Sequence, residues 1–366
     1  MVNDFHKEEK TALQSFFVIA NIILTTIFKY VIFQITTVKE MKKMDKLHCF
    51  FIQLSTNNYM DHDTIPSVTD HHHHNYLTTE KHVWDEITQF AADNGCNSIL
   101  IDLADGVKYK SHPEIACEGA WEPEYLKEEL KRLRKLGLTP YPKLNFSTGH
   151  GAWLGIYARM VATPKYYEVC KDLIDEVAEI FDYPEFFHLG LDEEDAINQQ
   201  KKEFVCYRQH ELIWHDLKFF FDCVKAHNIR PAIWYDYYIS HPKEFLENVP
   251  KDVIICPWFY GYIYGDVSAP QPDDERSVRK LNCFKELSEL GYDILPAGSN
   301  WTNTFNFRHL IRWNEEHTLP EHNKGLIITS WHATNEKNKY RHLDAINIAK
   351  FALKEVEEIF SGERLI

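Results

Sequence analysis

The 366-residue sequence predicts a single-domain (β/α)8 TIM barrel of the α/β class, preceded by a hydrophobic N-terminal extension. Three observations lead to this fold class. Apolar runs of strand length alternate with amphipathic helical segments about eight times, as in a parallel sheet with helical crossovers. No low-complexity linker interrupts this alternation, so we expect no second domain. A doubly wound open sheet is disfavoured because no GxGxxG loop follows the first apolar run.

Composition and charge narrow the classes of function. Aromatic residues make up 14% of the chain, and the formal net charge is −15. Phosphate recognition needs a basic surface, and the folded region has no cluster of Lys and Arg, so we expect no nucleic-acid partner. The eight cysteines are scattered without a CxxC pair, which indicates a reduced, cytoplasmic protein.

Residues 1–46 are interpreted as a leader that lies outside the fold. Within it, residues 11–38 are largely apolar over a length near the minimum for spanning a membrane. If this segment is an anchor, the lysines that follow it keep the domain at 47–366 in the cytoplasm. If Met41 or Met44 is the true start, the leader is never translated. We therefore expect a cytoplasmic protein, with membrane anchoring through residues 11–38 as the alternative and the only route to a membrane contact.

The first half of the barrel is expected to begin with three strands. Residues 49–55 and 97–104 are short apolar runs, and residues 138–147 alternate polar with apolar side chains. The alternation places Lys143 and Asn145 on one face, which indicates a polar barrel interior near its mouth. Helices with apolar residues at helical spacing are expected at 79–94, 122–136 and 164–181.

The second half repeats the pattern. Strands are expected at 230–238, 253–260, 293–301 and 326–331. Helices are expected at 207–227, 275–290, 305–316 and 343–360. With the fourth strand, described next, these segments complete eight strand–helix units.

The fourth strand lies in the stretch EFFHLGLDEED at 185–195, around which the site is expected to form. Side chains alternate faces along a strand, so His188, Gly190 and Asp192 share one face, and Glu193 follows directly. This pattern favours a strand that ends in a polar pocket. The alternative is an acidic cap on the following helix, which predicts that Asp192 and Glu193 face solvent outside any pocket.

Active sites of such barrels lie at the carboxyl ends of the strands, where this sequence gathers carboxylates, amides and indoles. Aromatic rings stack on the apolar faces of sugars, and paired carboxylates perform the acid–base steps of glycoside cleavage. These strand-end residues contain no HxH or HExxH pattern, so we expect neither a catalytic metal nor a cofactor. The candidate residues at the strand ends are Asp102, Asn145, His150, His188, Asp192, Glu193, Trp234, Asp236, Trp258, Tyr260, Trp301 and Trp331.

Four segments of the chain resemble one known family. HLGLDEE at 188–194 resembles the HxGxDE signature of family 20 glycoside hydrolases, the β-N-acetylhexosaminidases. PKLNFSTGH at 142–150 is similar to the motif of that family after its third strand, and WYD at 234–236 and SW at 330–331 fall where the family has Trp-Asp and Trp elements. The resemblance extends over the barrel, about residues 47–360.

The resemblance implies an exo-acting hydrolase of carbohydrate metabolism with a retaining, substrate-assisted mechanism. The 2-acetamido oxygen of the sugar attacks the anomeric carbon, Asp192 orients the acetamido group, and Glu193 serves as the general acid and base. The remaining residues would bind the amino-sugar glycoside: Trp234, Trp258, Trp301 and Trp331 as walls, Tyr260 at the acetamido oxygen, His150 and Asp236 at hydroxyls or behind Glu193, and Asn145, His188 and Asp102 as further substrate contacts.

The sequence departs from the family pattern at the third strand. Lys143 and Asn145 stand where the family usually has acids, and Leu191 replaces a usual glycine. These differences leave open the sugar, its linkage and two alternative functions. One is a glycosidase that uses Glu193 and Asp236 as its two carboxylates on a sugar without the acetamido group. The other is a barrel that binds a glycan without cleaving it.

Overall fold

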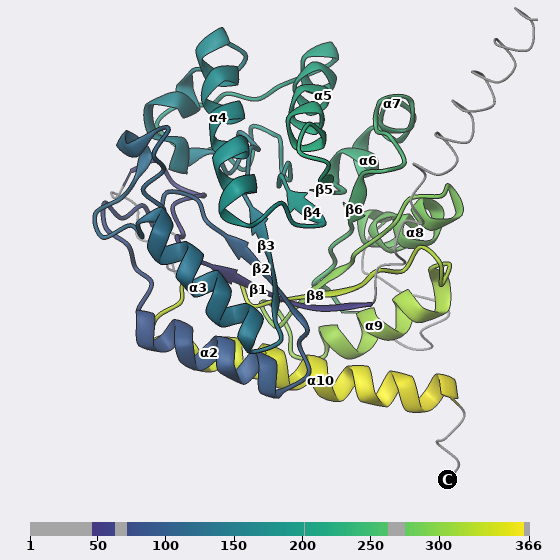
Figure 1. Ribbon diagram of the computed structural model, residues 1–366. Helices are drawn as coiled ribbons and strands as arrows, with labels where there is room; N and C mark the ends of the chain where they lie inside the picture. The colour runs from purple at the N-terminus through teal and green to yellow at the C-terminus, as the bar shows by residue number, and fades with distance from the viewer. Residues whose placement is uncertain (1–45, 63–71, 201, 263–274, 362–366) are drawn as a thin grey trace, which may run out of the picture. The chain divides into compact units, whose positions relative to one another are not determined.

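The computed structural model describes residues 46–62, 72–200, 202–262 and 275–361. The predicted leader at 1–46, including the apolar segment at 11–38, lies outside these ranges except for its last residue. Eight parallel strands form one sheet in the order β6-β5-β4-β3-β2-β1-β8-β7, and helices follow them (Figure 1). The predicted (β/α)8 fold class is confirmed.

The strands are short, and nearly all their residues are buried. They are β1 Leu47–Gln53, β2 Ser98–Asp102, β3 Thr139–Lys143, β4 Phe186–His188, β5 Arg230–Trp234, β6 Ile254–Cys256, β7 Ala297–Ser299 and β8 Gly325–Thr329. The barrel closes between β6 and β7, where Leu295 N donates to Ile255 O at 2.9 Å and Ala297 N donates to Pro257 O at 2.8 Å.

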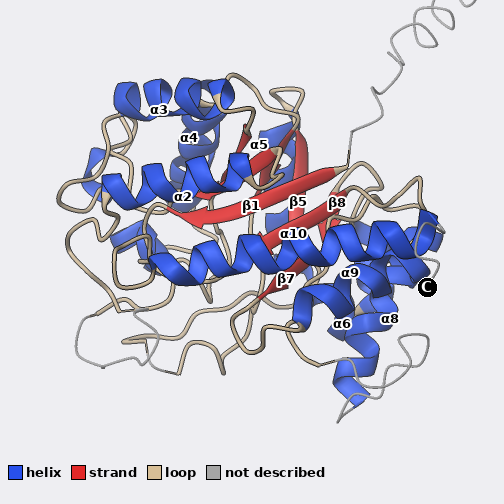
Figure 2. Ribbon diagram, turned by 90° about the horizontal axis from the view of Figure 1, so that it is seen from below, coloured by secondary structure: helices blue, strands red, loops and turns tan. Residues whose placement is uncertain are grey.

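Amphipathic helices cover the outside of this sheet. Helix α4 buries Val169, Leu173, Ile174 and Val177 at helical spacing, and Thr163 caps its start through a bond from Tyr166 N. The long helix α10 runs beside α2 (Figure 2). The helices are α2 Lys81–Asp93, α3 Pro123–Lys135, α4 Pro164–Ile180, α5 Glu211–Lys225, α6 Asp236–Ser240, α7 Pro242–Asn248, α8 Glu275–Glu289, α9 Asn306–His317 and α10 Lys339–Ser361, with the 3-10 turns η1 Pro113–Ile115 and η2 Ala152–Arg159.

One sequence-based expectation for the carboxyl ends of strands needs correction, and one alternative is excluded. The strand predicted at 230–238 ends at Trp234, because Asp236 begins helix α6, where a carboxylate favours the N-terminus. The acids at 192–195 do not cap a helix either. Helix α5 begins only at Glu211, and the described residues between 191 and 210 form turns and irregular structure.

Strand register produces a polar layer inside the barrel. Gln53 pairs with Asp102, Asp102 with Lys143, and Lys143 with His188. All four side chains are buried. Paired residues on neighbouring strands point to the same side, so this layer lies at the carboxyl end of β1–β4, beneath the mouth. Leu144 belongs instead to the hydrophobic core outside the sheet, as the alternation in the sequence predicted.

Among the residues described, no helix is both long and apolar enough to cross a lipid bilayer.

Candidate active site

The backbone after β4 turns sharply. Gly190, Leu191 and Glu193 have φ angles of +72°, +67° and +51°. Left-handed geometry costs a non-glycine residue about 1–3 kcal/mol, so the surrounding contacts must hold it in place. A Cβ at Gly190 would lie 2.0 Å from Asn145 Oδ1, which explains glycine there. The same oxygen accepts a hydrogen bond from Leu191 N at 3.1 Å.

This turn brings two carboxylates onto one imidazole. His150 Nε2 lies 3.3 Å from Asp192 Oδ2 and 3.1 Å from Glu193 Oε2. Asn145 Nδ2 donates to the other Asp192 oxygen at 2.8 Å. The Asp192 side chain is 15% exposed and that of Glu193 is 34% exposed, so Glu193 is the more accessible of the two carboxylates.

The charges in this cluster support each other. Burial opposes the charged form of His150, but Asp192 and Glu193 raise its pKa to about 10. Burial also opposes ionisation of Asp192, yet His150, Lys143 and the bond from Asn145 hold its pKa below the usual range. At neutral pH the pair is therefore an imidazolium beside an ionised Asp192.

A third carboxylate, Asp236, lies at the start of α6. Its Oδ2 accepts a hydrogen bond from Trp258 Nε1 at 2.8 Å. Burial and the negative charge of Asp192 raise the pKa of Asp236 to about 7, against the opposing effect of Lys280. Trp258 stacks on Tyr260 with ring centroids 5.1 Å apart. Asp236 is thus hydrogen-bonded to Trp258, which in turn stacks on Tyr260.

The polar layer beneath the mouth contains a buried ion pair. Lys143 Nζ lies 2.6 Å from Asp102 Oδ2, and both side chains are 1% exposed. Asn58 Nδ2 donates to the same carboxylate oxygen at 3.3 Å. Burial raises the pKa of Asp102, and the charge of Lys143 counteracts this shift. Lys143 thus stands where the resemblance leads one to expect an acid. Its ammonium group pairs with Asp102, the one acid of β2.

Aromatic rings form the other side of the mouth. Trp331 lies 6.1 Å from Trp234 and 6.3 Å from Tyr260, measured between ring centroids. Trp234 also packs against His188 at 4.4 Å. Trp301, at the end of β7, packs against His332 at 4.9 Å, next to Trp331 in the chain. The predicted aromatic residues therefore gather at one end of the barrel, with Trp301 on its rim.

Several buried polar atoms near the mouth have no hydrogen-bond partner within the described residues. Such atoms are rare in folded proteins unless water or a ligand satisfies them. His188 Nδ1 accepts from Gly190 N at 3.0 Å, so its Nε2 bears the proton and can donate. The buried atoms near the mouth without a hydrogen-bond partner are Gln53 Oε1, Asn58 Oδ1, Asp102 Oδ1, His150 Nδ1, His188 Nε2 and Trp234 Nε1. It offers both donors and acceptors, as a polyhydroxylated ligand requires.

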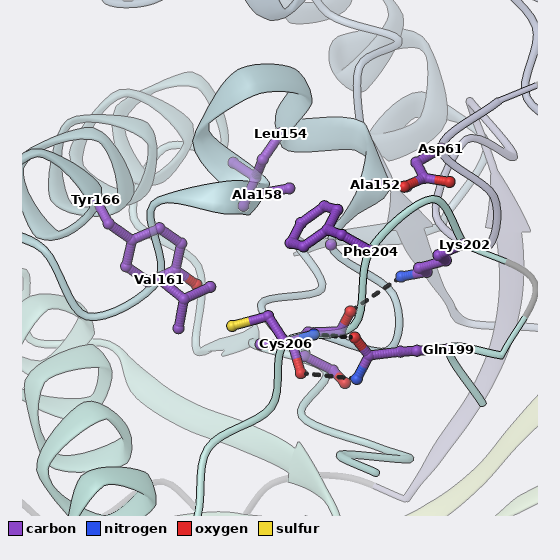
Figure 3. A pocket seen from close by; sticks show the side chains of 13 residues that line it. Asp61, Ala152, Leu154, Ala158, Val161, Tyr166, Gln199, Lys202, Phe204 and Cys206 are labelled. Atoms are coloured by element: carbon purple, nitrogen blue, oxygen red, sulfur yellow. Dashed lines mark hydrogen bonds between the residues drawn. The ribbon is translucent and has the colours of Figure 1, made fainter. Parts of the chain in front are cut away.

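Two cavities adjoin this cluster. One of about 210 Å³ is lined by Glu193 and Asp236 together with Tyr207, His241 and Arg276, among others. The other, of about 20 Å³, lies among Leu154, Tyr166, Phe204, Cys206 and their neighbours, where Gln199 Oε1 accepts from Cys206 N at 3.0 Å (Figure 3). The second cavity has room for about one water molecule and cannot admit a sugar. The first opens directly onto Glu193 and Asp236.

The cluster also has the atoms of a possible metal site. Ligand atoms of His150, Asp192 and Glu193 all lie within 4.8 Å of one another. The two carboxylates raise the pKa of His150 to about 10, so a metal would have to displace a proton from this imidazole. The absence of a catalytic metal stays a prediction.

Sequence reasoning missed several residues of the site. Gln53 Nε2 donates to the Tyr59 hydroxyl at 3.2 Å, and the Tyr59 ring lies 5.1 Å from that of His150. Glu194 and Arg208 form a buried ion pair beside the catalytic candidates. Tyr59 and Arg208 lie in irregular segments, where no periodicity marks a side chain as inward-facing. Only the run of acids in the sequence pointed to Glu194.

Comparisons with known proteins show similarity in structure. No protein-family model matches the chain, and no curated protein matches it in sequence. The chitobiase of Flavobacterium johnsoniae superposes with a TM-score of 0.52 at 15% identity, over 86% of this chain and 52% of that one. The GH20 β-N-acetylhexosaminidase of Streptomyces coelicolor superposes with a TM-score of 0.54 at 12% identity, over 83% of this chain and 64% of that one.

The β-N-acetylhexosaminidase of Bacteroides fragilis gives a TM-score of 0.52 at 14% identity, over 87% of this chain and 71% of that one. The shared property is the fold. This chain has a barrel like that of GH20 β-N-acetylhexosaminidases, and it spans about half the length of the chitobiase. The neighbours are glycosidases, and at this identity their chemistry does not transfer by itself.

Proposed function

We propose that the protein is an exo-acting glycoside hydrolase that removes a terminal β-linked N-acetylhexosamine with retention of configuration. The observation that carries the proposal is the convergence of Asp192 and Glu193 on His150 at the mouth of a barrel. Two adjacent carboxylates in different environments are what such a reaction requires, because one must stay ionised while the other exchanges a proton.

The two carboxylates take different roles. Asp192, held ionised by His150 and Lys143, accepts a hydrogen bond from the acetamido N–H and directs the acetamido oxygen toward the anomeric carbon. As that oxygen forms its bond, the glycosidic bond breaks and Glu193 gives its proton to the leaving oxygen. Glu193 then removes a proton from water, which opens the oxazolinium intermediate and restores the retained sugar.

The remaining candidate residues bind the sugar. Trp234, Trp331 and Tyr260 offer aromatic faces, and the unpartnered atoms of Asp102 and His188 offer an acceptor and a donor for hydroxyl groups. The leaving group enters the cavity of about 210 Å³ beside Glu193. Asn145 holds Asp192, and His150 contacts both carboxylates.

Structural neighbours support a carbohydrate as the substrate class. The Streptomyces plicatus β-hexosaminidase is described in complex with its product GlcNAc, and the Vibrio harveyi exo β-N-acetylglucosaminidase in complex with N-acetylglucosamine. Both share the barrel at 12% and 15% identity. N-acetylglucosamine and N-acetylgalactosamine are therefore the first sugars to test here.

The decisive experiment measures hydrolysis of aryl β-N-acetylglucosaminide and β-N-acetylgalactosaminide by the wild type and by Glu193→Gln. A thiazoline mimic of the oxazoline intermediate serves as the binding probe. We expect turnover by the wild type, a loss of about 10²–10⁴-fold in the variant and mimic binding by both. Mimic binding without turnover would favour the glycan-binding barrel. If the wild type neither turns over nor binds the mimic, the proposal is wrong.

Asp236 supports a second candidate function. It shares the cavity with Glu193, and its raised pKa suits a group that exchanges protons near neutral pH. A glycosidase using Glu193 and Asp236 as its carboxylates would act on sugars without an acetamido group. Comparable turnover of aryl β-glucosides and β-N-acetylglucosaminides would favour it, whereas strict dependence on the acetamido group would exclude it.

We further propose that residues 47–366 form the catalytic domain and that it resides in the cytoplasm. All eight cysteines lack a disulfide, and most are buried, as in a reduced protein. Membrane anchoring through residues 11–38 remains the alternative. Fractionation of cells that express the full chain would separate the two, with the protein in the soluble fraction supporting the first.

A further inference from the structure

The acid that follows the two catalytic candidates has a different environment. Glu194 is 3% exposed at its side chain. Its oxygens accept hydrogen bonds from Thr148 N at 2.9 Å and Thr148 Oγ1 at 2.8 Å. They also accept from Arg208 Nε at 2.9 Å, Arg208 Nη2 at 3.0 Å and Arg208 N at 3.1 Å. Five donors from two segments therefore hold this one carboxylate in place.

Arg208 connects three parts of the barrel mouth. Its guanidinium is fully buried and pairs with Glu194 through a two-pronged contact. The same group donates to Phe146 O at 2.6 Å, beyond β3, and to Asp216 Oδ2 at 3.2 Å, on α5. Arg208 thus ties the segment after β4 to the segment after β3 and to the following helix.

The clamped residue adjoins a strained one. Glu193 has a φ angle of +51°, which a glutamate rarely adopts without support. Its carbonyl oxygen would lie 2.6 Å from a Cβ at Gly149, so the segment after β3 packs directly on this backbone. Lys202 Nζ donates to Thr148 O at 2.9 Å and Gly149 O at 2.7 Å, which holds that segment from the other side.

A buried ion pair is weak evidence for stability, because desolvation offsets much of the attraction. It does impose one geometry, since its oxygens and N–H groups must all be satisfied together. Here that geometry is imposed on the residue next to Glu193, whose own side chain reaches His150 Nε2 at 3.1 Å.

We propose that Arg208, acting through Glu194, is a positioning residue that fixes the left-handed backbone from which Glu193 delivers its proton. The inference rests on the proposed function, because it assigns Glu193 the role of general acid. It extends that function by identifying which residues beyond the His150–Asp192–Glu193 cluster set the direction of proton transfer.

Leaving-group dependence tests this role. Glu193 matters most for substrates with a basic leaving group and least for dinitrophenyl glycosides, whose phenol departs without a proton. For Arg208→Lys, which keeps the charge and loses the two-pronged contact, we expect a fall in kcat/KM of about 10–100-fold with the phenyl β-N-acetylhexosaminide and within about threefold with the dinitrophenyl one. Affinity for the thiazoline mimic should change by less than about threefold.

Glu194→Gln provides a second route if Arg208→Lys fails to fold, because the amide keeps the shape of the side chain and removes its charge. We expect the same dependence on the leaving group. Glu129→Gln is the matched control for loss of a buried, ion-paired carboxylate. Glu129 bonds to Trp84 and Arg132 between the outer helices α2 and α3, so its substitution should leave the dependence unchanged.

The outcomes separate the inference from the function on which it rests. An equal loss with both leaving groups would mean that Arg208 supports only the fold, and it would overturn the inference while the wild type still hydrolyses the substrates. A wild type that hydrolyses neither substrate would overturn the proposed function, and the inference with it. A loss confined to the phenyl glycoside supports both.

Discussion

The two halves of the barrel mouth differ in the chemistry of their side chains. Strands β1–β4 end in polar and charged groups, among them the Asp102–Lys143 pair and the His150–Asp192–Glu193 cluster. Strands β5–β8 end in indoles and phenols, with Trp331 packed near Trp234 and Tyr260. The first half holds charges at fixed positions, and the second offers flat apolar faces. Substitutions in the two halves should therefore change different constants.

The halves also differ in how the surrounding residues hold them. The polar half depends on buried ion pairs. Removing one member of such a pair is strongly destabilising, because the other charge is then buried without a partner. The aromatic half depends on packing, where one ring can be replaced by another apolar group at a smaller cost.

Lys143→Met should cause the largest loss, and it acts on stability. The substitution leaves the buried Asp102 carboxylate without its cation, which costs about 3–5 kcal/mol in the free energy of unfolding. Urea denaturation measures the change. Lys143→Met combined with Asp102→Asn should recover most of it, because no charge is then unpaired. A loss below about 1 kcal/mol in the single variant would contradict the account of the polar half.

Asp192→Asn should act on turnover. The amide cannot supply the negative charge that orients the acetamido group, so kcat should fall about 10²–10³-fold. The pKa of His150, about 10 with both carboxylates present, should fall as well, because Asp192 contributes the largest of the effects that raise it. NMR titration of the imidazole checks this shift. An unchanged His150 pKa would mean that Glu193 alone holds the proton.

Trp331→Leu should act on binding. Leucine keeps apolar bulk and loses the aromatic face, so KM for the sugar should rise about five- to tenfold with kcat within about threefold. Tyr340→Leu is the matched control, because Tyr340 is 59% exposed on α10 and its loss should change neither constant. A fall in kcat alone would show that the aromatic half takes part in the chemistry and would break the division between the halves.

Asp236→Asn should change the pH dependence of stability. The pKa of Asp236 is about 7 in the folded protein and about 4 in the unfolded chain, so the folded state binds more protons between these values. Stability therefore falls as pH rises from about 4 to about 7, and the variant should lack this part of the slope. Thermal unfolding of both proteins at several pH values measures it. Parallel curves would contradict the raised pKa.

The sequence predicted the barrel and the strand that carries Asp192 and Glu193, because strand–helix alternation and side-chain alternation are local patterns. It also placed Lys143 and Asn145 on one polar face. It misplaced Asp236, which begins a helix instead of continuing a strand, because the aromatic and β-branched residues near 233–239 favour a strand by local propensity. Local propensity does not decide which of the two forms at the end of a barrel strand.

The sequence by itself determined the eightfold repeat and which residue types gather at the strand ends, since both follow from spacing along the chain. Only the tertiary structure decided that Lys143 pairs with Asp102, that His150 contacts both carboxylates, and that Arg208 clamps Glu194. Each of these contacts joins residues from different strands or loops. Their partners are set by strand register and by backbone turns at positive φ, which no local pattern in the chain encodes.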